Sequence, residues 1–270
     1  MRVPPVRAPR PWRVAVLGNS VPILMVPPRQ HRRTGTYSEL LPELLAADGV
    51  DATVVNHARL FELVHEGARR FRRELIGASP DVLVLHYGML ELQPNVLPTT
   101  LNRHLSREDP GGRGLQGLWI RHGVPRAWPV ARTWQRWASA RVGDRGWRLP
   151  PKRVAAELAR LIDVARQERA LVLVIDVHRP GSRLEHFLPG VGRRWVRMQA
   201  VLHDVVSSRR DPDVRLIPAS AIVAELGEAG GAPDGLHLTA AGHRMLAELL
   251  AAEISTWVKA LVLDPGTGEP

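Results

Sequence analysis

The chain has 270 residues, 44% of them hydrophobic, which is enough for one large domain or two small ones with an apolar core. It contains no cysteine, so disulfides and every thiolate nucleophile or thiolate metal site are excluded. The formal net charge is +10, but the arginines that produce it are spread over nearly every segment. We therefore expect a solvated basic surface and no nucleic-acid partner.

The two ends of the chain differ from its middle. Residues 1–12 are rich in proline and arginine and are followed by only a short apolar run, which predicts a flexible leader and not a signal peptide. No stretch approaches the roughly 18 uninterrupted apolar residues that a membrane span needs. We expect a cytoplasmic protein with a single domain over residues 13–262 and a disordered tail over residues 263–270.

Five short, almost continuously apolar runs predict β-strands that are covered on both faces. These runs are Arg13–Leu17, Ala52–Asn56, Val82–His86, Leu171–Val177 and Val214–Pro218. Segments with helical spacing of apolar residues separate most of them, and strand–helix alternation is typical of a parallel sheet. The predicted fold is a three-layer α/β/α, doubly wound (flavodoxin-like) sheet of about five parallel strands, in the order 2-1-3-4-5.

The connection between the third and fourth runs is unusually long. Its residues, about 102–150, contain five of the eight tryptophans: Trp119, Trp128, Trp134, Trp137 and Trp147. A connection of this length usually has its own structure or a function. We expect a mostly helical insertion over the carboxyl end of the sheet, either a subdomain packed on its own tryptophans or a lid that forms a substrate-binding wall.

Polar residues follow the apolar runs at the edge where a doubly wound sheet binds its ligands. Ser20 comes just after the first run, and Asp234 and His237 lie three apart before the last helical segment. A serine hydroxyl becomes a good nucleophile when a histidine takes its proton and a carboxylate orients that histidine. Taken alone, each signal also fits ordinary turn and helix-cap chemistry.

Other polar residues at this edge have two interpretations each. His178 could line the site or be a loop histidine with a structural hydrogen bond. Glu91 could be an acid near the site or a charge at a helix N-terminus. Asp176 and His178 have no third ligand at a recognisable spacing, and Gly18 stands alone, so we expect no metal, no phosphate-binding loop and no cofactor.

Three short blocks resemble the motifs of the SGNH (GDSL-type) hydrolases. Gly18-Asn19-Ser20 is similar to the family's first block, with asparagine in place of aspartate. Gly88-Met89-Leu90-Glu91 resembles the block after the third strand, and Asp234-Gly235-Leu236-His237 matches the block before the last helix. The order and spacing of the blocks agree over about residues 13–260, so the resemblance covers nearly the whole chain.

The resemblance implies a catalytic triad of Ser20 as nucleophile, His237 as general base and Asp234 as its orienter. It also implies an oxyanion hole made by the backbone N–H groups of Ser20 and Gly88. The family's oxyanion asparagine falls on Leu90, which has no side-chain donor. Asn19 and Asn95 are candidate replacements, and they join Glu91 and His178 as candidate pocket residues.

The implied function is an esterase that cleaves a small or medium acyl ester through an acyl-serine intermediate, with neither metal nor cofactor. The basic surface would also suit an anionic or carrier-bound ester. Two alternatives stay open: an acyltransferase that uses the same triad, and a degenerate domain of this fold that only binds a ligand. The sequence does not define the acyl group, the alcohol or the oligomeric state.

Overall fold

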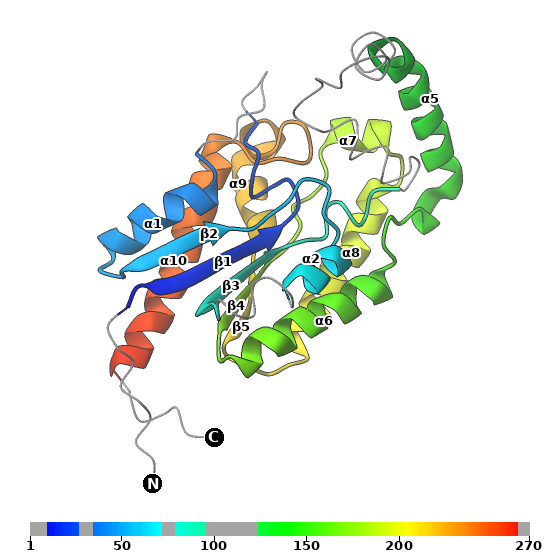
Figure 1. Ribbon diagram of the computed structural model, residues 1–270. Coiled ribbons are helices and arrows are strands. Elements are labelled where there is room, and N and C mark those ends of the chain that lie inside the picture. The colour runs from blue at the N-terminus through cyan, green and yellow to red at the C-terminus, as the bar shows by residue number, and fades with distance from the viewer. Residues whose placement is uncertain (1–9, 27–34, 72–78, 95–123, 264–270) are drawn as a thin grey trace, which may run out of the picture.

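A five-stranded parallel sheet forms the centre of the computed structural model, which describes residues 10–26, 35–71, 79–94 and 124–263 (Figure 1). The strand order is β2-β1-β3-β4-β5. The strands span β1 (Trp12–Gly18), β2 (Ala52–Asn56), β3 (Val82–His86), β4 (Leu171–Ile175) and β5 (Val214–Ile217). The predicted fold class and strand order are confirmed, although β4 ends two residues before the predicted Val177.

Helices cover both faces of the sheet. One layer packs on the core that holds Val14, Val16 and Val84, and it comprises α1 (Tyr37–Ala47), α9 (Ala219–Gly231) and α10 (Ala240–Leu263). The opposite layer packs on Leu17, Leu83 and Leu85, and it comprises α2 (Val64–Arg70), α6 (Pro151–Gln167) and α8 (Val191–Ser207). Every residue of β3 and β4 is buried, which explains why their sequences are apolar without alternation.

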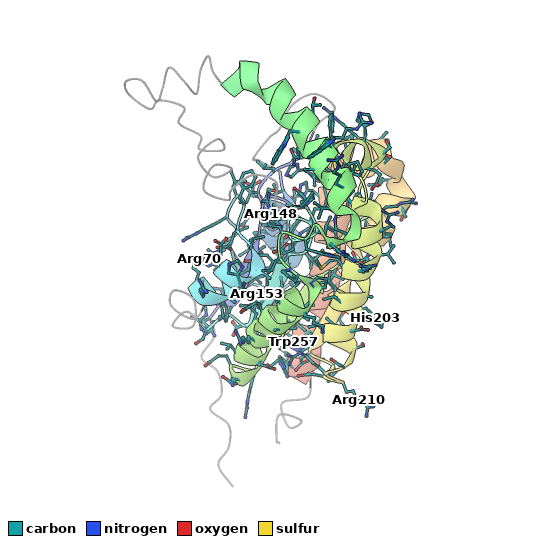
Figure 2. The ribbon with its side chains drawn as sticks, turned by 90° about the vertical axis from the view of Figure 1, so that its right-hand side faces the viewer. Arg70, Arg148, Arg153, His203, Arg210 and Trp257 are labelled. Atoms are coloured by element: carbon teal, nitrogen blue, oxygen red, sulfur yellow. The ribbon has the colours of Figure 1, made fainter. Side chains whose placement is uncertain are left out.

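The predicted ends of the domain need a small correction at the N-terminus. Trp12 is the first residue of β1, and the Arg10 guanidinium pairs with the Asp81 carboxylate at 3.0 Å, so residues 10–12 belong to the fold and not to the leader. Trp257 of α10, labelled in Figure 2, packs edge-on against Trp12 with ring centroids 5.5 Å apart. Within the described residues, no helix combines the length and apolarity needed to cross a bilayer.

The described part of the Trp-rich insertion is helical, as predicted. It contains α5 (Val124–Val142) and the short 3-10 helix η4 (Gly143–Arg145), and Figure 1 shows α5 at the end of the molecule, next to α7 (Ser182–Phe187). Trp134 and Trp137 are about half exposed, so these two rings do not form a packed core. Trp147, in contrast, packs against the core below α6 and α8.

A buried arginine fastens the insertion to the sheet. Arg194 of α8 is fully buried, and its Nε donates to the backbone oxygen of Leu92, after β3, at 2.8 Å. Its Nη1 donates to the backbone oxygen of Gly143, where η4 begins. One side chain therefore links the loop that follows β3 to the end of the insertion.

Candidate active site

Ser20 lies in a tight turn just beyond β1. The backbone N–H groups of Ile23 and Leu24 both donate to the Ser20 carbonyl, at 3.0 and 2.9 Å, which closes the turn. A Cβ atom at Gly18 would lie 2.8 Å from both the His86 carbonyl oxygen and the Pro22 side chain. Only glycine fits there, so the turn that presents the Ser20 hydroxyl depends on Gly18.

The loop between α9 and α10 places an acid and a base next to this hydroxyl. Asp234 Oδ2 accepts a hydrogen bond from His237 Nδ1 at 2.7 Å, and His237 Nε2 lies 2.9 Å from Ser20 Oγ. Because the carboxylate can only accept, Nδ1 carries the ring proton and Nε2 is left to accept from the serine. The structure thus brings Ser20, His237 and Asp234 together, as the sequence predicted.

Backbone hydrogen bonds fix the carboxylate of Asp234. Its Oδ1 accepts from the backbone N–H groups of Leu236 and His237, each at 2.8 Å. Burial by itself raises the pKa of Asp234, but the hydrogen bonds and charge of His237 together with the backbone N–H of Leu236 outweigh it and lower the pKa to about 2. The carboxylate therefore stays ionised and can stabilise an imidazolium at His237.

Two further buried histidines, His243 and His86, lie near the serine turn and both contact Tyr37. His243 of α10 accepts a hydrogen bond at Nδ1 from the Tyr37 N–H at 3.2 Å and donates through Nε2 to the Leu24 carbonyl at 3.1 Å. Nδ1 of His86 lies 3.3 Å from the Tyr37 hydroxyl. Burial lowers the pKa of His243 to about 4 and that of His86 to about 3, so both rings are neutral and act as fixed hydrogen-bonding groups.

His178 is buried and does not line the cavity at Ser20, so its interpretation as a pocket residue is not supported by the structure. Burial lowers its pKa to about 4; the Asp234 charge opposes this effect and the His237 charge adds to it. The ring is therefore neutral, and its pKa depends in part on the charges of Asp234 and His237.

Glu91 is wholly buried and accepts hydrogen bonds from two backbone N–H groups. This corrects two expectations, Glu91 as a pocket residue and the Gly88 N–H as an oxyanion donor. Its Oε1 accepts from the Val64 N–H at the start of α2, and its Oε2 accepts from the Gly88 N–H, both at 2.8 Å. Glu91 is thus a structural crosslink and not a pocket residue. Because the Gly88 N–H donates to Glu91, it is not free to serve as an oxyanion donor in this structure.

A cavity of about 390 Å³ opens in front of the serine. It is lined by Asn19, Ser20, Leu24, Leu60, Phe61, Met89, Leu90, Gln93, Leu236 and His237. None of these side chains carries a fixed charge, and most are apolar. Asn19 therefore lines the cavity, as predicted for a pocket residue, whereas Asn95 lies outside the described residues.

Sequence reasoning missed the wall formed by Leu60 and Phe61. These residues follow β2 and line the cavity, and Phe61 has a left-handed backbone conformation with a φ of 59°. Their apolar side chains match no catalytic motif. Their position just after a parallel strand could still have indicated the site, because the loops after parallel strands meet at one edge of the sheet.

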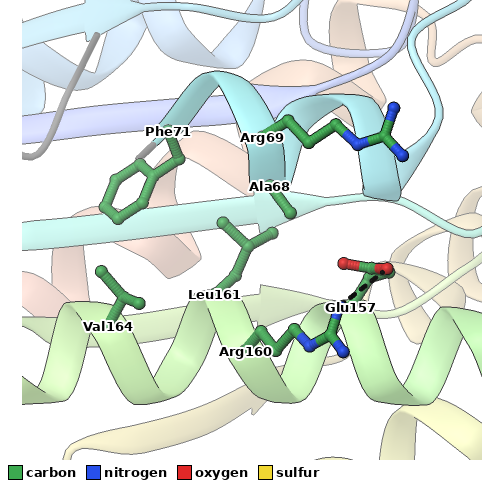
Figure 3. A pocket seen from close by; sticks show the side chains of 7 residues that line it. All are labelled: Ala68, Arg69, Phe71, Glu157, Arg160, Leu161 and Val164. Atoms are coloured by element: carbon green, nitrogen blue, oxygen red, sulfur yellow. Dashed lines mark hydrogen bonds and ion pairs between the residues drawn. The ribbon is translucent and has the colours of Figure 1, made fainter. Parts of the chain in front are cut away.

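Two other hollows lie away from Ser20 and His237. A cavity of about 240 Å³ lies between α2 and α6, where Figure 3 shows Glu157 paired with Arg160 beside Leu161. A groove of about 840 Å³ runs along α7, α8 and α9 and is lined by both charged and apolar residues. In the described ranges, no group of three or more histidine, aspartate or glutamate side chains could hold a metal ion.

No family model and no curated protein sequence matches the chain. Solved structures do resemble it: a lipase/acylhydrolase from Enterococcus faecalis is 15% identical, with a TM-score of 0.61 over 91% of this chain and 96% of that one. An acetylxylan esterase from Geobacillus stearothermophilus is 15% identical, with a TM-score of 0.57 over 90% and 94% of the two chains. A GDSL-like lipase from Bacteroides thetaiotaomicron is 12% identical, with a TM-score of 0.53 over 91% and 88%. The chain thus has the three-layer fold of GDSL-type lipases and esterases.

Proposed function

We propose that the protein is a carboxylic ester hydrolase that works through an acyl-serine intermediate on Ser20. The single observation that carries this proposal is the continuous chain of hydrogen bonds from Ser20 Oγ through His237 to Asp234. The structures that share its fold include a lipase/acylhydrolase and an acetylxylan esterase, and this supports the same reaction class.

In the proposed reaction, Ser20 Oγ bonds to the carbonyl carbon of the ester while its proton passes to His237 Nε2. The carbonyl electron pair moves to its oxygen, which becomes an oxyanion. This pair then returns, the bond from carbon to the alcohol oxygen breaks, and the alcohol takes the proton from His237. A water molecule next attacks the acyl-serine in the same way and releases the acid. Throughout, the ionised Asp234 holds the imidazolium in place.

The lining of the cavity supports a neutral acyl group of small or medium size. Its volume of about 390 Å³ lies toward the lower end of the range of roughly 300–1,000 Å³ typical of small-molecule sites. Leu24, Leu60 and Phe61 contribute apolar surface, and none of the described lining residues carries a fixed charge that would pair with an anionic acyl group. The proposed substrate is therefore an uncharged acyl ester, and any anionic or carrier portion would belong to the alcohol side.

The proposal is tested with a series of p-nitrophenyl esters of increasing acyl length. The wild type should hydrolyse them with a preference for one chain length, and Ser20→Ala should lose this activity. Ser182→Ala is the matched control, because Ser182 lies on the surface, bonds to Glu228 and is outside the cavity, so its activity should be unchanged. Equal turnover by the wild type and Ser20→Ala would contradict the proposal.

A further inference from the structure

Among the described residues, the cavity at Ser20 has few hydrogen-bond donors for the oxyanion that an acyl transfer creates. Such a charge must be met by donors that are already in place, and each is typically worth about 10²–10³-fold in turnover. The Gly88 N–H is bonded to Glu91, and Leu90 offers only a hydrocarbon side chain. His237 is already bonded at both ring nitrogens, to Asp234 and Ser20. The backbone N–H of Ser20 is one candidate donor, and a second donor must therefore come from elsewhere in the lining.

The side-chain amide of Asn19 has such a donor. Asn19 is 2% exposed and lines the same cavity as Ser20, its neighbour in the chain. Its Oδ1 accepts from the Val21 N–H at 3.4 Å, and this bond orients the amide. Within the described part of the chain, its Nδ2 is buried and makes no hydrogen bond.

An unpaired amide N–H in this position requires an explanation. Leaving a buried donor without an acceptor is destabilising, and the large majority of buried polar groups have a partner. A group that is unpaired in the free protein and lies beside a nucleophile can obtain its partner when the substrate reacts. The acceptor that appears at this place during ester cleavage is the oxyanion.

We infer that Asn19 is a catalytic residue whose Nδ2–H donates to the oxyanion formed when Ser20 attacks the ester carbonyl. This inference rests on the proposed function. Asn19, the residue before the nucleophile, would supply the side-chain donor to the oxyanion that Leu90 lacks. Because the oxyanion exists only along the reaction path, the hydrogen bond should lower the barrier and leave ground-state binding nearly unchanged.

Two substitutions separate this role from a purely structural one. Asn19→Asp keeps the shape of the side chain and the acceptor for the Val21 N–H but removes the Nδ2 donor. Asn19→Ala removes both groups and adds no charge. If the donor acts on the oxyanion, both variants should lose about 10²–10³-fold in kcat, with KM changed less than about threefold.

The competing explanations give different results with the same pair. If Asn19 only holds the turn through its Oδ1, Asn19→Asp should retain kcat while Asn19→Ala loses it. If the effect came only from a new negative charge, Asn19→Ala should retain kcat while Asn19→Asp loses it. Either result overturns the inference. Circular dichroism and thermal unfolding of each variant establish that the fold is retained.

A trifluoromethyl ketone gives a second measurement, because its adduct with a serine hydroxyl carries a stable oxyanion. Its affinity should fall in both Asn19 variants by a factor similar to that in kcat, and an unchanged affinity would contradict the inference. A wild type whose ester turnover does not depend on Ser20 would instead overturn the proposed function. Ser20-dependent turnover with fully active Asn19 variants would overturn the inference about Asn19 alone.

Discussion

The two sides of Ser20 differ in how their polar groups are used. On the side of the base, His237 and Asp234 have hydrogen-bond partners at distances of 2.7–2.9 Å, and two backbone N–H groups fix the carboxylate. On the side where the oxyanion would form, Leu90 is apolar and the Gly88 N–H is bonded to Glu91. The polar groups of the base side are thus all paired with one another, whereas the opposite side has an amide donor at Asn19 that no group of the described residues accepts from.

In the proposed mechanism, the activation of Ser20 and the stabilisation of the oxyanion therefore rely on different parts of the chain. Activation would rely on one four-residue block, Asp234–His237, whose backbone and side chains are hydrogen-bonded to one another. Stabilisation of the oxyanion would rely on groups from several loops that meet at the carboxyl edge of the sheet.

The largest effect should come from breaking the base side. Ser20→Ala and His237→Ala should each lower kcat by about 10⁴–10⁶-fold, because neither group can act without the other. The double variant should be no slower than the slower single variant. Steady-state kinetics with circular dichroism as a fold control make this test, and multiplicative losses in the double variant would show that the two residues act separately.

Asp234→Asn should have a smaller effect, a loss of about 10³–10⁴-fold in kcat, because the amide no longer stabilises the imidazolium and can favour the wrong ring tautomer. The pKa of Asp234 is about 2, so protonation of this carboxylate should not limit the wild-type rate above about pH 4. The pH profile of kcat measures this. An acidic limb assigned to Asp234 near pH 5, one that Asp234→Asn removes, would contradict the proposed electrostatics.

Glu91→Ala tests the scaffold of the oxyanion side. It leaves the Val64 and Gly88 N–H groups buried without an acceptor, so the free energy of unfolding should fall by about 2–5 kcal/mol. Glu225→Ala is the matched control, because Glu225 is exposed on α9 and its replacement should cost at most about 1 kcal/mol. Urea unfolding measures both; equal, small losses would show that Glu91 is not a crosslink.

The smallest effect concerns the histidines near the serine turn. His243 has a pKa of about 4 in the fold, below its ordinary value of 6.5, so unfolding takes up a proton between these values. Stability should therefore fall as the pH drops from about 6.5 toward 4, with about 2 kcal/mol lost from this group between pH 7 and pH 5. His243→Gln should reduce this dependence. His203→Gln, at the exposed ring labelled in Figure 2, should not, and an equal reduction by both would contradict the assignment.

The sequence predicted the sheet and the base side because both are encoded locally. Continuous apolar runs indicate buried parallel strands, and Asp234 and His237 lie within one short block whose spacing fixes their contact. The oxyanion side was predicted incorrectly at Gly88 and Glu91. Their hydrogen bond joins two residues only three apart, but it depends on the burial of Glu91 against the start of α2. Burial of one side chain cannot be read from spacing.

The apolar wall at Leu60 and Phe61 was missed for a related reason. Leucine and phenylalanine are common core residues, and only the three-dimensional meeting of the loops after β1, β2 and β3 turns them into cavity lining. The support from His243 depends on a contact with Leu24 across 219 positions of the chain. Such long-range pairs are set by the packing of α10 on the sheet and leave no local pattern.

The pairing of a reactive Ser20 with His237 is tested most directly by a fluorophosphonate probe followed by peptide mass spectrometry. The wild type should carry one phosphonate adduct, on Ser20, and the adduct should be absent from Ser20→Ala and form far more slowly in His237→Ala. A folded wild type without an adduct on Ser20, or an equal rate of labelling in the wild type and His237→Ala, would contradict the assignment of Ser20 as an activated nucleophile.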